Sequence, residues 1–437
     1  MIDRRTVIAA AGALAVSPAL ARTLGKPLNP AFPSGFVWGA STAGHQIEGN
    51  NVSSDTWFLE NIKPTVFAEP SGDACNSLVL WPQDMDLAKA MGLNAYRFSI
   101  EWARIEPEQG LFSVAMLDHY RRMIVGARAR GLQPVVTFSH FTAPRWFAAG
   151  GGWLQPGAAD LFARYCDRAA RHMGDGIGHA VTFNEPNIMR LLTTLGLPEQ
   201  IWEGQRAMLA EAARRSGTPK FSALNVANRE DIEPLQLALH GAHTAGRAAI
   251  KAAHGNLPVG LSLAMFDDQA AGKNSIRDTV RKALYGDWLE IARGDDFLGV
   301  QNYERAIWGA KGKLPPPPDA IRGTTGTEVY APSLAGAVRY AHAIAQVPIL
   351  VTEHGVNTRD DTVRAALIPS ALAELKKAID EGVPVTGYCH WSLLDNFEWI
   401  FGYGPQLGLH SVDRTTFART AKPSAAVYGA IARKNAL

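Results

Sequence analysis

The stretch VTFNEPN, Val181–Asn187, lies almost midway along this chain of 437 residues. An apolar run ends abruptly there in Asn184, Glu185 and Pro186. One interpretation is that Glu185 is a catalytic group at the end of a strand. The other is that Asn184 caps a helix, since an acid and a proline are favoured in the first helical turn. The rest of the sequence has to decide between them.

Short apolar runs of the same kind recur along the chain. Longer amphipathic segments separate most of them, and several of these segments end in Gly before the next run, as helices do at their carboxyl ends. Near-continuous apolar strands with helices between them indicate a parallel sheet that is covered on both faces. Eight such units predict an α/β fold, a (β/α)8 TIM barrel. The eight runs are Gly35–Ser41, Ala95–Ile100, Pro134–His140, His179–Glu185, Val259–Ala264, Phe297–Tyr303, Pro348–His354 and Thr386–Ser392.

Polar side chains gather at the carboxyl ends of these runs, which is the face where barrels of this type carry their active sites. They are His140, Asn184, Glu185, Asn302, Tyr303, Glu353 and Trp391. A doubly wound sheet is the competing fold, but it usually has a Gly-rich phosphate loop after its first strand, which this sequence lacks. We expect residues from about Arg190 to Ile232 to form an irregular, polar excursion over the barrel mouth. The motif LPPPPD, Leu314–Asp319, is expected to be a stiff surface loop.

Composition and charge exclude several classes of function. The chain is 47% hydrophobic and 19% charged, as is ordinary for a globular protein, and its net charge of +2 points neither to nucleic acid nor to an acidic membrane surface. Several of the eleven Trp lie beside polar residues, an arrangement that sugar-binding sites favour. Cys75, Cys166 and Cys389 show no metal spacing and no disulfide framework, although one disulfide is possible.

The N-terminus resembles an export signal. Arg4 and Arg5 precede a short apolar run that ends in Ala19, Leu20 and Ala21, which is a small-x-small cleavage site. We therefore expect residues 1–21 to be a twin-arginine-like signal peptide and residues 22–437 to be a single barrel domain. This predicts export, to the periplasm of a bacterium, with no stable membrane anchor because the run is too short to span a membrane. The alternative is an ordinary N-terminal segment.

Two glutamates end predicted strands on nearly opposite sides of the barrel. Glu185 ends the fourth strand and Glu353 ends the seventh, so both carboxylates can point into the mouth. A pair of carboxylates that flank a bond is what glycoside hydrolysis requires, one as acid and the other as nucleophile or base. For an arbitrary pair, separate solvated residues or ion-pair partners would be the simpler explanation.

Four motifs in this order make the chain resemble glycoside hydrolase family 1, the β-glucosidase family, from about Phe32 to Pro423. FPSGFVWGASTAGHQIEGN resembles the N-terminal signature of the family, and TFNEP resembles its acid/base motif. VTEHG resembles its nucleophile motif, which usually has Asn where this chain has His354. GYCHWSLLDNFEW is similar to its C-terminal signature.

The resemblance implies a retaining mechanism in which Glu353 is the nucleophile and Glu185 is the acid and then the base. It implies that Arg97 keeps Glu353 ionised and that Tyr303 hydrogen-bonds it. The residues expected to contact the sugar are Gln46, His140, Asn184, Trp391, Glu398 and Trp399. Each also has a purely structural interpretation: Trp391 as a core residue, His140 as a satisfied strand-end histidine, and Arg97 as an ion-pair partner.

Glu398 and four departures from the family pattern bear on the substrate. Family members that act on 6-phosphorylated sugars usually have a small hydroxyl residue at the position of Glu398 and a lysine nearby for the phosphate. This chain has no such lysine, and the carboxylate of Glu398 would repel a phosphate, so the resemblance implies a sugar with a free 6-hydroxyl. Phe141 stands where the family has Trp, and a Gly- and His-rich stretch expected after the acid/base motif is replaced by IMRLLTTLGLPEQIWEG. The other two departures are the segments Gln301–Tyr303 and Gln406–Gly408.

Taken together, the sequence predicts an exported retaining β-glycosidase that hydrolyses terminal, non-phosphorylated β-D-glucosides, with β-galactosides or β-fucosides as further candidates. The expected partner is a small-molecule glycoside or oligosaccharide, with no metal or organic cofactor and no nucleic acid, and the oligomeric state is open. Two rivals remain: a transglycosylating enzyme of the same fold, and a catalytically silent sugar-binding barrel.

Overall fold

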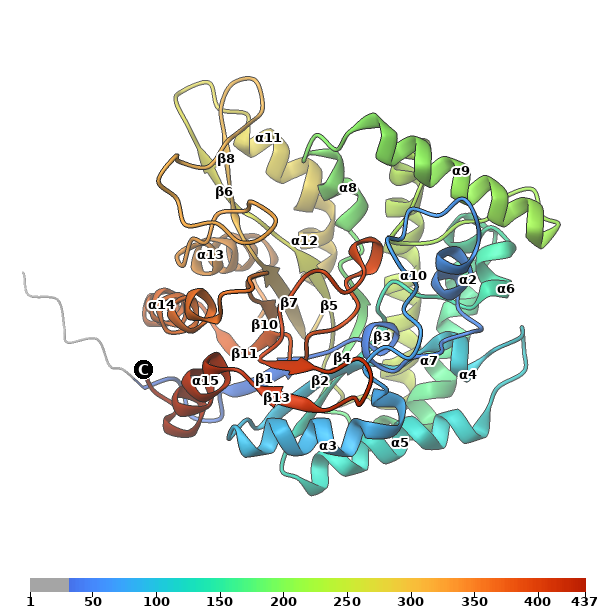
Figure 1. Ribbon diagram of the computed structural model, residues 1–437, viewed down its shortest axis with the longest axis horizontal. Helices are drawn as coiled ribbons and strands as arrows, with labels where there is room; N and C mark the ends of the chain where they lie inside the picture. The colour runs from blue at the N-terminus through green and yellow to red at the C-terminus, as the bar shows by residue number, and fades with distance from the viewer. Residues whose placement is uncertain (1–30) are drawn as a thin grey trace, which may run out of the picture.

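A computed structural model describes residues 31–437, so the predicted signal peptide lies outside the described residues. Eight parallel strands close into a barrel in the order β1-β11-β10-β7-β5-β4-β3-β2, which confirms the predicted TIM barrel (Figure 1). All eight predicted runs are barrel strands. They are β1 (Val37–Ser41), β2 (Ala95–Ser99), β3 (Gln133–Ser139), β4 (His179–Asn184), β5 (Val259–Ala264), β7 (Phe297–Asn302), β10 (Ile349–His354) and β11 (Val385–Trp391).

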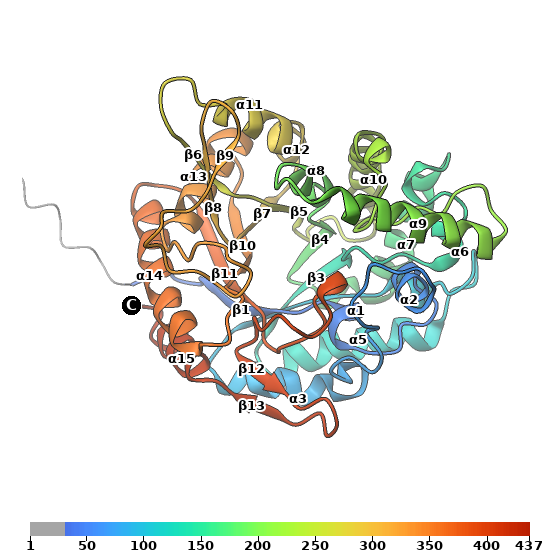
Figure 2. The same ribbon diagram turned by 45° about the horizontal axis from the view of Figure 1, so that its top comes forward.

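Helices surround these strands, because each strand is buried on both faces and needs apolar cover. Figures 1 and 2 show the ring of helices around the strands, with α9 toward its periphery. The helices are α1 (Gly44–Ile47), α2 (Asp55–Asn61), α3 (Ser77–Ala90), α4 (Trp102–Ile105), α5 (Val114–Ala129), α6 (Arg145–Ala149), α7 (Ala158–Met173), α8 (Ile188–Thr193), α9 (Glu199–Ser216), α10 (Ile232–Ala253), α11 (Arg277–Arg281), α12 (Asp287–Ala292), α13 (Ser333–Ala345), α14 (Asp361–Asp380) and α15 (Pro423–Lys434).

Glycines end several of the predicted helices. Gly92, Gly131 and Gly382 follow α3, α5 and α14, and each has a positive φ. This left-handed conformation carries little steric cost for Gly and closes the last helical turn before the next strand. The sequence signal of a Gly after an amphipathic segment therefore marked real helix ends.

Two small sheets lie beside the barrel. One pairs β12 (His410–Val412) with β13 (Arg419–Ala421), and the other joins β6 (Asp267–Ala270), β8 (Arg305–Trp308) and β9 (Lys313–Leu314). The motif LPPPPD begins in β9 and continues as an irregular segment outside the helices and strands. Among residues 31–437, no helix is long and apolar enough to cross a membrane.

The barrel interior is closed below the mouth by apolar side chains. A buried cluster takes one residue from each of six strands, namely Val37, Ala95, Val135, Val181, Phe297 and Leu350. A packed layer of this kind leaves the carboxyl ends of the strands as the face where polar side chains can form a site.

Candidate active site

The two glutamates stand where the barrel strands shift register. The pairing of β4 with β5 shifts between Val181 and Asn184, and that of β10 with β7 shifts between Val351 and Glu353. Such irregularities re-aim side chains at strand ends and are common next to active sites. Both glutamates line one shared cavity.

The helix-cap interpretation of VTFNEPN is wrong. Glu185 has a positive φ of 43°, which a residue in a right-handed helical turn cannot have. The next helix, α8, begins only at Ile188, and the residue before it is Asn187. Asn184 is the last residue of β4, and its side chain is used in the site instead of on a helix.

Glu353 is held by a hydrogen bond on each carboxylate oxygen. The guanidinium Nη1 of Arg97 donates to Oε1 at 2.6 Å, and the hydroxyl of Tyr303 donates to Oε2 at 2.6 Å. Burial raises the pKa of Glu353, while Arg97, Tyr303 and Gln301 act against burial and favour the carboxylate. These donors fix the orientation of the group and make it the better-stabilised anion of the pair.

Arg97 also fixes the amide of Asn184. Its Nη2 donates to Oδ1 of Asn184 at 2.6 Å, and Nε2 of Gln301 donates to the same oxygen at 2.7 Å. With both acceptor positions of Oδ1 occupied, the amide NH2 of Asn184 is left as the group that faces a ligand. Gln301, which in the sequence is only a departure from the family pattern, thus belongs to the site. Its strand lies two strands from that of Asn184, and this proximity gives no signal in the sequence.

Glu185 has the opposite environment. No residue in the described part of the chain donates a hydrogen bond to its carboxyl group. Burial and then the negative charge of Glu353 raise the pKa of Glu185 well above its ordinary value, with Glu398 adding to the effect and Arg97 opposing it. Glu185 is therefore the member of the pair that retains its proton, which is the state that a general acid requires.

The two carboxyl groups line one cavity of about 330 Å³ together with every predicted sugar-contacting residue. Nε2 of Gln46 lies 3.3 Å from Oε1 of Glu398, and Nε1 of Trp391 donates to the same oxygen at 3.2 Å. Burial raises the pKa of Glu398 to about 8. At neutral pH this acid is mostly protonated, so it can both donate to and accept from hydroxyl groups.

Aromatic rings form one wall of this cavity. The ring of His140 stacks on Trp391 with the centroids 5.8 Å apart and on Trp399 with the centroids 6.1 Å apart. Burial and the charge of Arg97 lower the pKa of His140, which keeps the imidazole neutral. Its Nδ1 is buried and has no partner among the described residues, so a ligand can supply one. Phe141, in place of the family Trp, packs edge-on against Trp399.

The excursion after β4 lines one side of the cavity, and it is more regular than expected. About half of Arg190–Ile232 is helical, in the end of α8 and the whole of α9. Trp202, Met208 and Leu209 lie on the buried face of α9. Packing of this face stabilises the helix despite its polar composition. The segment adds Leu192, Leu197, Gln205, Asn225 and Val226 to the cavity lining.

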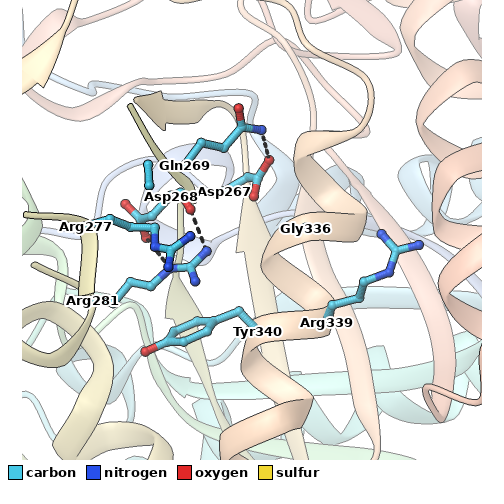
Figure 3. Close-up of a pocket in the computed structure, with 9 residues that line it drawn as sticks. Asp267, Asp268, Gln269, Arg277, Arg281, Gly336, Arg339 and Tyr340 are labelled. Carbon is cyan, nitrogen blue, oxygen red and sulfur yellow. Dashed lines mark hydrogen bonds and ion pairs between the residues drawn. The ribbon is translucent and has the colours of Figure 1, made fainter. Parts of the chain in front are cut away.

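A second cavity, of about 510 Å³, lies between β6, α11 and α13 (Figure 3). Each of its charged side chains has at least one hydrogen-bond or ion-pair partner within the protein. Asp268 accepts from Nε1 of Trp308 at 2.6 Å, Asp267 accepts from Gln269, and Arg339, which points away from the aspartates, pairs with Glu381. Arg281 on α11 lies 3.8 Å from the carboxylate of Asp268 and donates to its carbonyl oxygen at 2.5 Å, which links this helix to β6. None of the predicted site residues lines this cavity.

His354 and the cysteines have structural positions. His354 contacts the hydroxyl of Tyr388 at 2.9 Å through Nδ1, and burial lowers its pKa to about 4. Cys75, Cys166 and Cys389 are all buried and free. Within residues 31–437 there is no cluster of three or more His, Cys, Asp or Glu that could hold a metal ion.

Comparison with known proteins agrees with this geometry. The family model described as glycosyl hydrolase family 1 matches residues 28–197 and 325–437. The chain belongs to glycosyl hydrolase family 1. It is therefore a glycoside hydrolase that acts on O-glycosyl bonds, a β-glycosidase with a small-molecule glycoside as substrate. The family model leaves out residues 198–324, the part of the chain that contains α9 and Gln301.

Individual members of family 1 match over nearly the whole chain. The β-glucosidase of Agrobacterium sp. is 31% identical over 444 residues, which cover 92% of this chain and 95% of the relative. The solved structure of the β-glycosidase BGL167 is 45% identical with a TM-score of 0.87, covering 94% of this chain and 98% of its own. That of β-glucosidase 1317 is 41% identical with the same TM-score, covering 91% and 98%.

Proposed function

We propose that this family 1 enzyme is a retaining β-glycosidase that hydrolyses terminal, non-phosphorylated β-D-glucosides by double displacement. The observation that carries the proposal is the asymmetry of the carboxyl pair. Glu353 is stabilised as an anion by Arg97 and Tyr303, whereas buried Glu185 faces the same cavity with a raised pKa and no donor among the described residues. Glu353 is thus prepared to attack the anomeric carbon, and Glu185 is prepared to protonate the glycosidic oxygen.

In the first step, a carboxylate oxygen of Glu353 attacks the anomeric carbon and forms an ester bond to the sugar. The bond from the anomeric carbon to the glycosidic oxygen breaks, and Glu185 transfers its proton to that oxygen as the alcohol leaves. Arg97 and Tyr303 hold the nucleophile in one orientation, so little rotational freedom is lost when it attacks.

In the second step, the charges of the pair are exchanged. Glu353 is now a neutral ester, so the charge that raised the pKa of Glu185 is absent and Glu185 is a carboxylate. Glu185 takes a proton from water, the resulting hydroxyl bonds to the anomeric carbon, and the ester bond breaks to return the Glu353 carboxylate. Two displacements at one carbon leave the β configuration unchanged.

The glycone is a sugar with a free 6-hydroxyl. Because the pKa of Glu398 is about 8, this group is mostly neutral at pH 7, and repulsion by its charge contributes less than the sequence suggested. The stronger argument is that no lysine or arginine is among the described residues that line the cavity. A phosphate dianion would lose its hydration there without gaining a counter-charge.

Chemical rescue tests the double displacement. Glu353→Gly should abolish hydrolysis of an aryl β-glucoside, because no group remains to attack the anomeric carbon. Azide should restore turnover and give the α-glucosyl azide, since one displacement inverts the configuration. In the unaltered enzyme, NMR should detect the β-anomer of glucose as the first product. Undiminished hydrolysis by Glu353→Gly, or α-glucose as the first product, would refute the proposal.

Transfer of the sugar to an acceptor other than water is the second candidate function. Apolar residues on the exit side of the cavity, such as Leu192 and Leu197, favour it because an apolar alcohol can bind there and compete with water for the intermediate. Turnover of an aryl β-glucoside with added alcohols would reveal alkyl glucosides among the products. Free glucose as the only product would eliminate this candidate.

We also propose export through the twin-arginine-like segment with Arg4 and Arg5. Replacing both arginines by lysine in the producing bacterium should move the enzyme from the periplasmic to the cytoplasmic fraction. Periplasmic activity that is unaffected by this replacement would contradict the proposal.

A further inference from the structure

The side of the catalytic cavity from which a leaving group departs is lined mainly by apolar side chains. We infer that the natural leaving group is an apolar alcohol or phenol, not a second sugar; this inference rests on the proposed hydrolytic function. The residues that form this apolar wall are Ile188, Leu192, Leu197, Val226, Ile400 and Phe401.

The position of the apolar wall follows from its connection to Glu185. Three residues after Glu185, Ile188 begins α8, and Leu192 follows one helical turn later on the same face. Glu185 protonates the glycosidic oxygen, so the group attached to that oxygen must pass beside the acid. Ile188 and Leu192 line the cavity there, where the leaving group first contacts protein.

The polar atoms on this side are too few for a sugar. Oε1 of Gln205 already accepts a hydrogen bond from the backbone N–H of Ala227 at 2.9 Å. The NH2 group of Gln205 and the amide of Asn225 remain, and neither Oδ1 nor Nδ2 of Asn225 has a partner in the described part of the chain. A glucosyl leaving group carries several further hydroxyls, and each one left unpaired against apolar surface weakens binding by about five- to 150-fold.

The apolar wall continues to the surface. Ile400 is half-buried, and Phe401, at the end of the short helix Trp399–Phe401, is 62% exposed at the rim. An exposed aromatic ring that continues a buried apolar surface offers contact area to a bulky group outside the cavity. The leaving group can therefore be larger than the enclosed volume.

A series of alkyl β-glucosides measures this preference directly. Methanol and hexanol differ little in acidity, so the chemistry of the bond is nearly constant along the series while apolar area grows. Each methylene that reaches the apolar wall should raise kcat/KM about fourfold, which corresponds to ~0.8 kcal/mol. Cellobiose should be hydrolysed with a kcat/KM well below that of hexyl β-glucoside. A flat alkyl series, or cellobiose equal to hexyl β-glucoside, overturns the inference.

A substitution in the apolar wall tests its location. Leu192→Asn should lower the ratio of kcat/KM for hexyl over methyl β-glucoside about tenfold, or ~1.4 kcal/mol. Leu197→Asn provides a second half-buried position in case the first variant folds poorly. The matched control is Leu237→Asn, because Leu237 is 69% exposed and lies on α10 outside the cavity. A ratio that is the same in all three variants and the unaltered enzyme overturns the inference.

Hydrolysis of 4-nitrophenyl β-glucoside separates the two proposals. If the enzyme does not turn over this activated substrate, the proposed function fails and the inference fails with it. If it does, while the alkyl series is flat, the proposed function stands and only the apolar leaving group is refuted.

Discussion

The charge of Glu353 should control the acidity of Glu185, and Glu353→Gln removes that charge at nearly constant volume. For carboxyl groups ~5.5 Å apart, as is typical of retaining pairs, and an effective dielectric constant of ~20, the repulsion is about 3 kcal/mol. Since 1.36 kcal/mol corresponds to one pKa unit, the substitution should lower the pKa of Glu185 by about two. Burial, the largest cause of the raised pKa, is unchanged in the variant.

Carbon-13 NMR of protein labelled at the glutamate carboxyl carbons measures this change. The signal of Glu185 is assigned as the one that is lost in Glu185→Gln, and its titration is then compared between the unaltered enzyme and Glu353→Gln. Glu398→Gln is the matched control, because Glu398 also faces the cavity but has a smaller effect on the pKa of Glu185.

A pKa of Glu185 that changed by less than ~0.5 in Glu353→Gln would refute this reasoning, since 0.5 corresponds to only ~0.7 kcal/mol of repulsion. It would also remove the physical basis for the exchange of roles between the two steps. In the proposed mechanism, esterification of Glu353 by the sugar eliminates the same charge as the substitution does. A lower pKa in Glu353→Gln is therefore the measurable counterpart of the step in which the acid becomes a base.

Three further predictions concern two groups near the pair and one glycine on the outer helix α10. Tyr303→Phe removes the hydrogen bond to Oε2 of Glu353, so kcat/KM for an aryl β-glucoside should fall about 10- to 100-fold, or ~1.5–3 kcal/mol. The acidic limb of its pH profile should move to higher pH, because the lost donor stabilised the carboxylate; an unmoved limb would contradict this role. Gly355→Ala places a Cβ 2.2 Å from the carbonyl oxygen of Trp391, so the backbone at Trp391 must shift, and the melting temperature and kcat/KM should both fall. A variant with unchanged kcat/KM would show that activity does not depend on the position of Trp391. Gly241→Ala, in α10 with open space around the new Cβ, should instead raise the free energy of unfolding by about 0.5–1 kcal/mol in a denaturant titration, and a decrease would contradict the open environment.

The barrel was predictable from the sequence because its signal is local. Each strand is a short apolar run, several helix ends are marked by a Gly, and the polar residues at the strand ends fall on one face once the strands are parallel. The position of Glu353 at the end of β10 required no knowledge of its neighbours. The same holds for Glu185 at the end of β4, although its left-handed backbone, which excludes a helix start, was not visible in the sequence.

Features that depend on contacts between distant segments were not predictable. Gln301 joins the site only because Asn184 lies two strands away in the barrel, with its oxygen 2.7 Å from the amide of Gln301. Helix α9 was missed because its buried face mixes large apolar residues, such as Trp202, with small and polar ones, such as Ala212 and Gln205. A segment whose helix depends on packing gives a weak pattern in a single sequence.

The two sides of the cavity are consequently held in place by different means. On the sugar side, Arg97 donates to both Glu353 and Asn184, so one buried guanidinium fixes the proposed nucleophile and a ligand-facing amide together. A change to either group would leave a buried charge or polar atom without its partner, which costs several kcal/mol. On the leaving-group side, Leu192 and Leu197 contribute apolar surface without such bonds, so substitutions there change binding but leave the carboxyl pair in position. Specificity for the leaving group can therefore vary on α8 and the segment after it without disturbing the chemistry at the anomeric carbon.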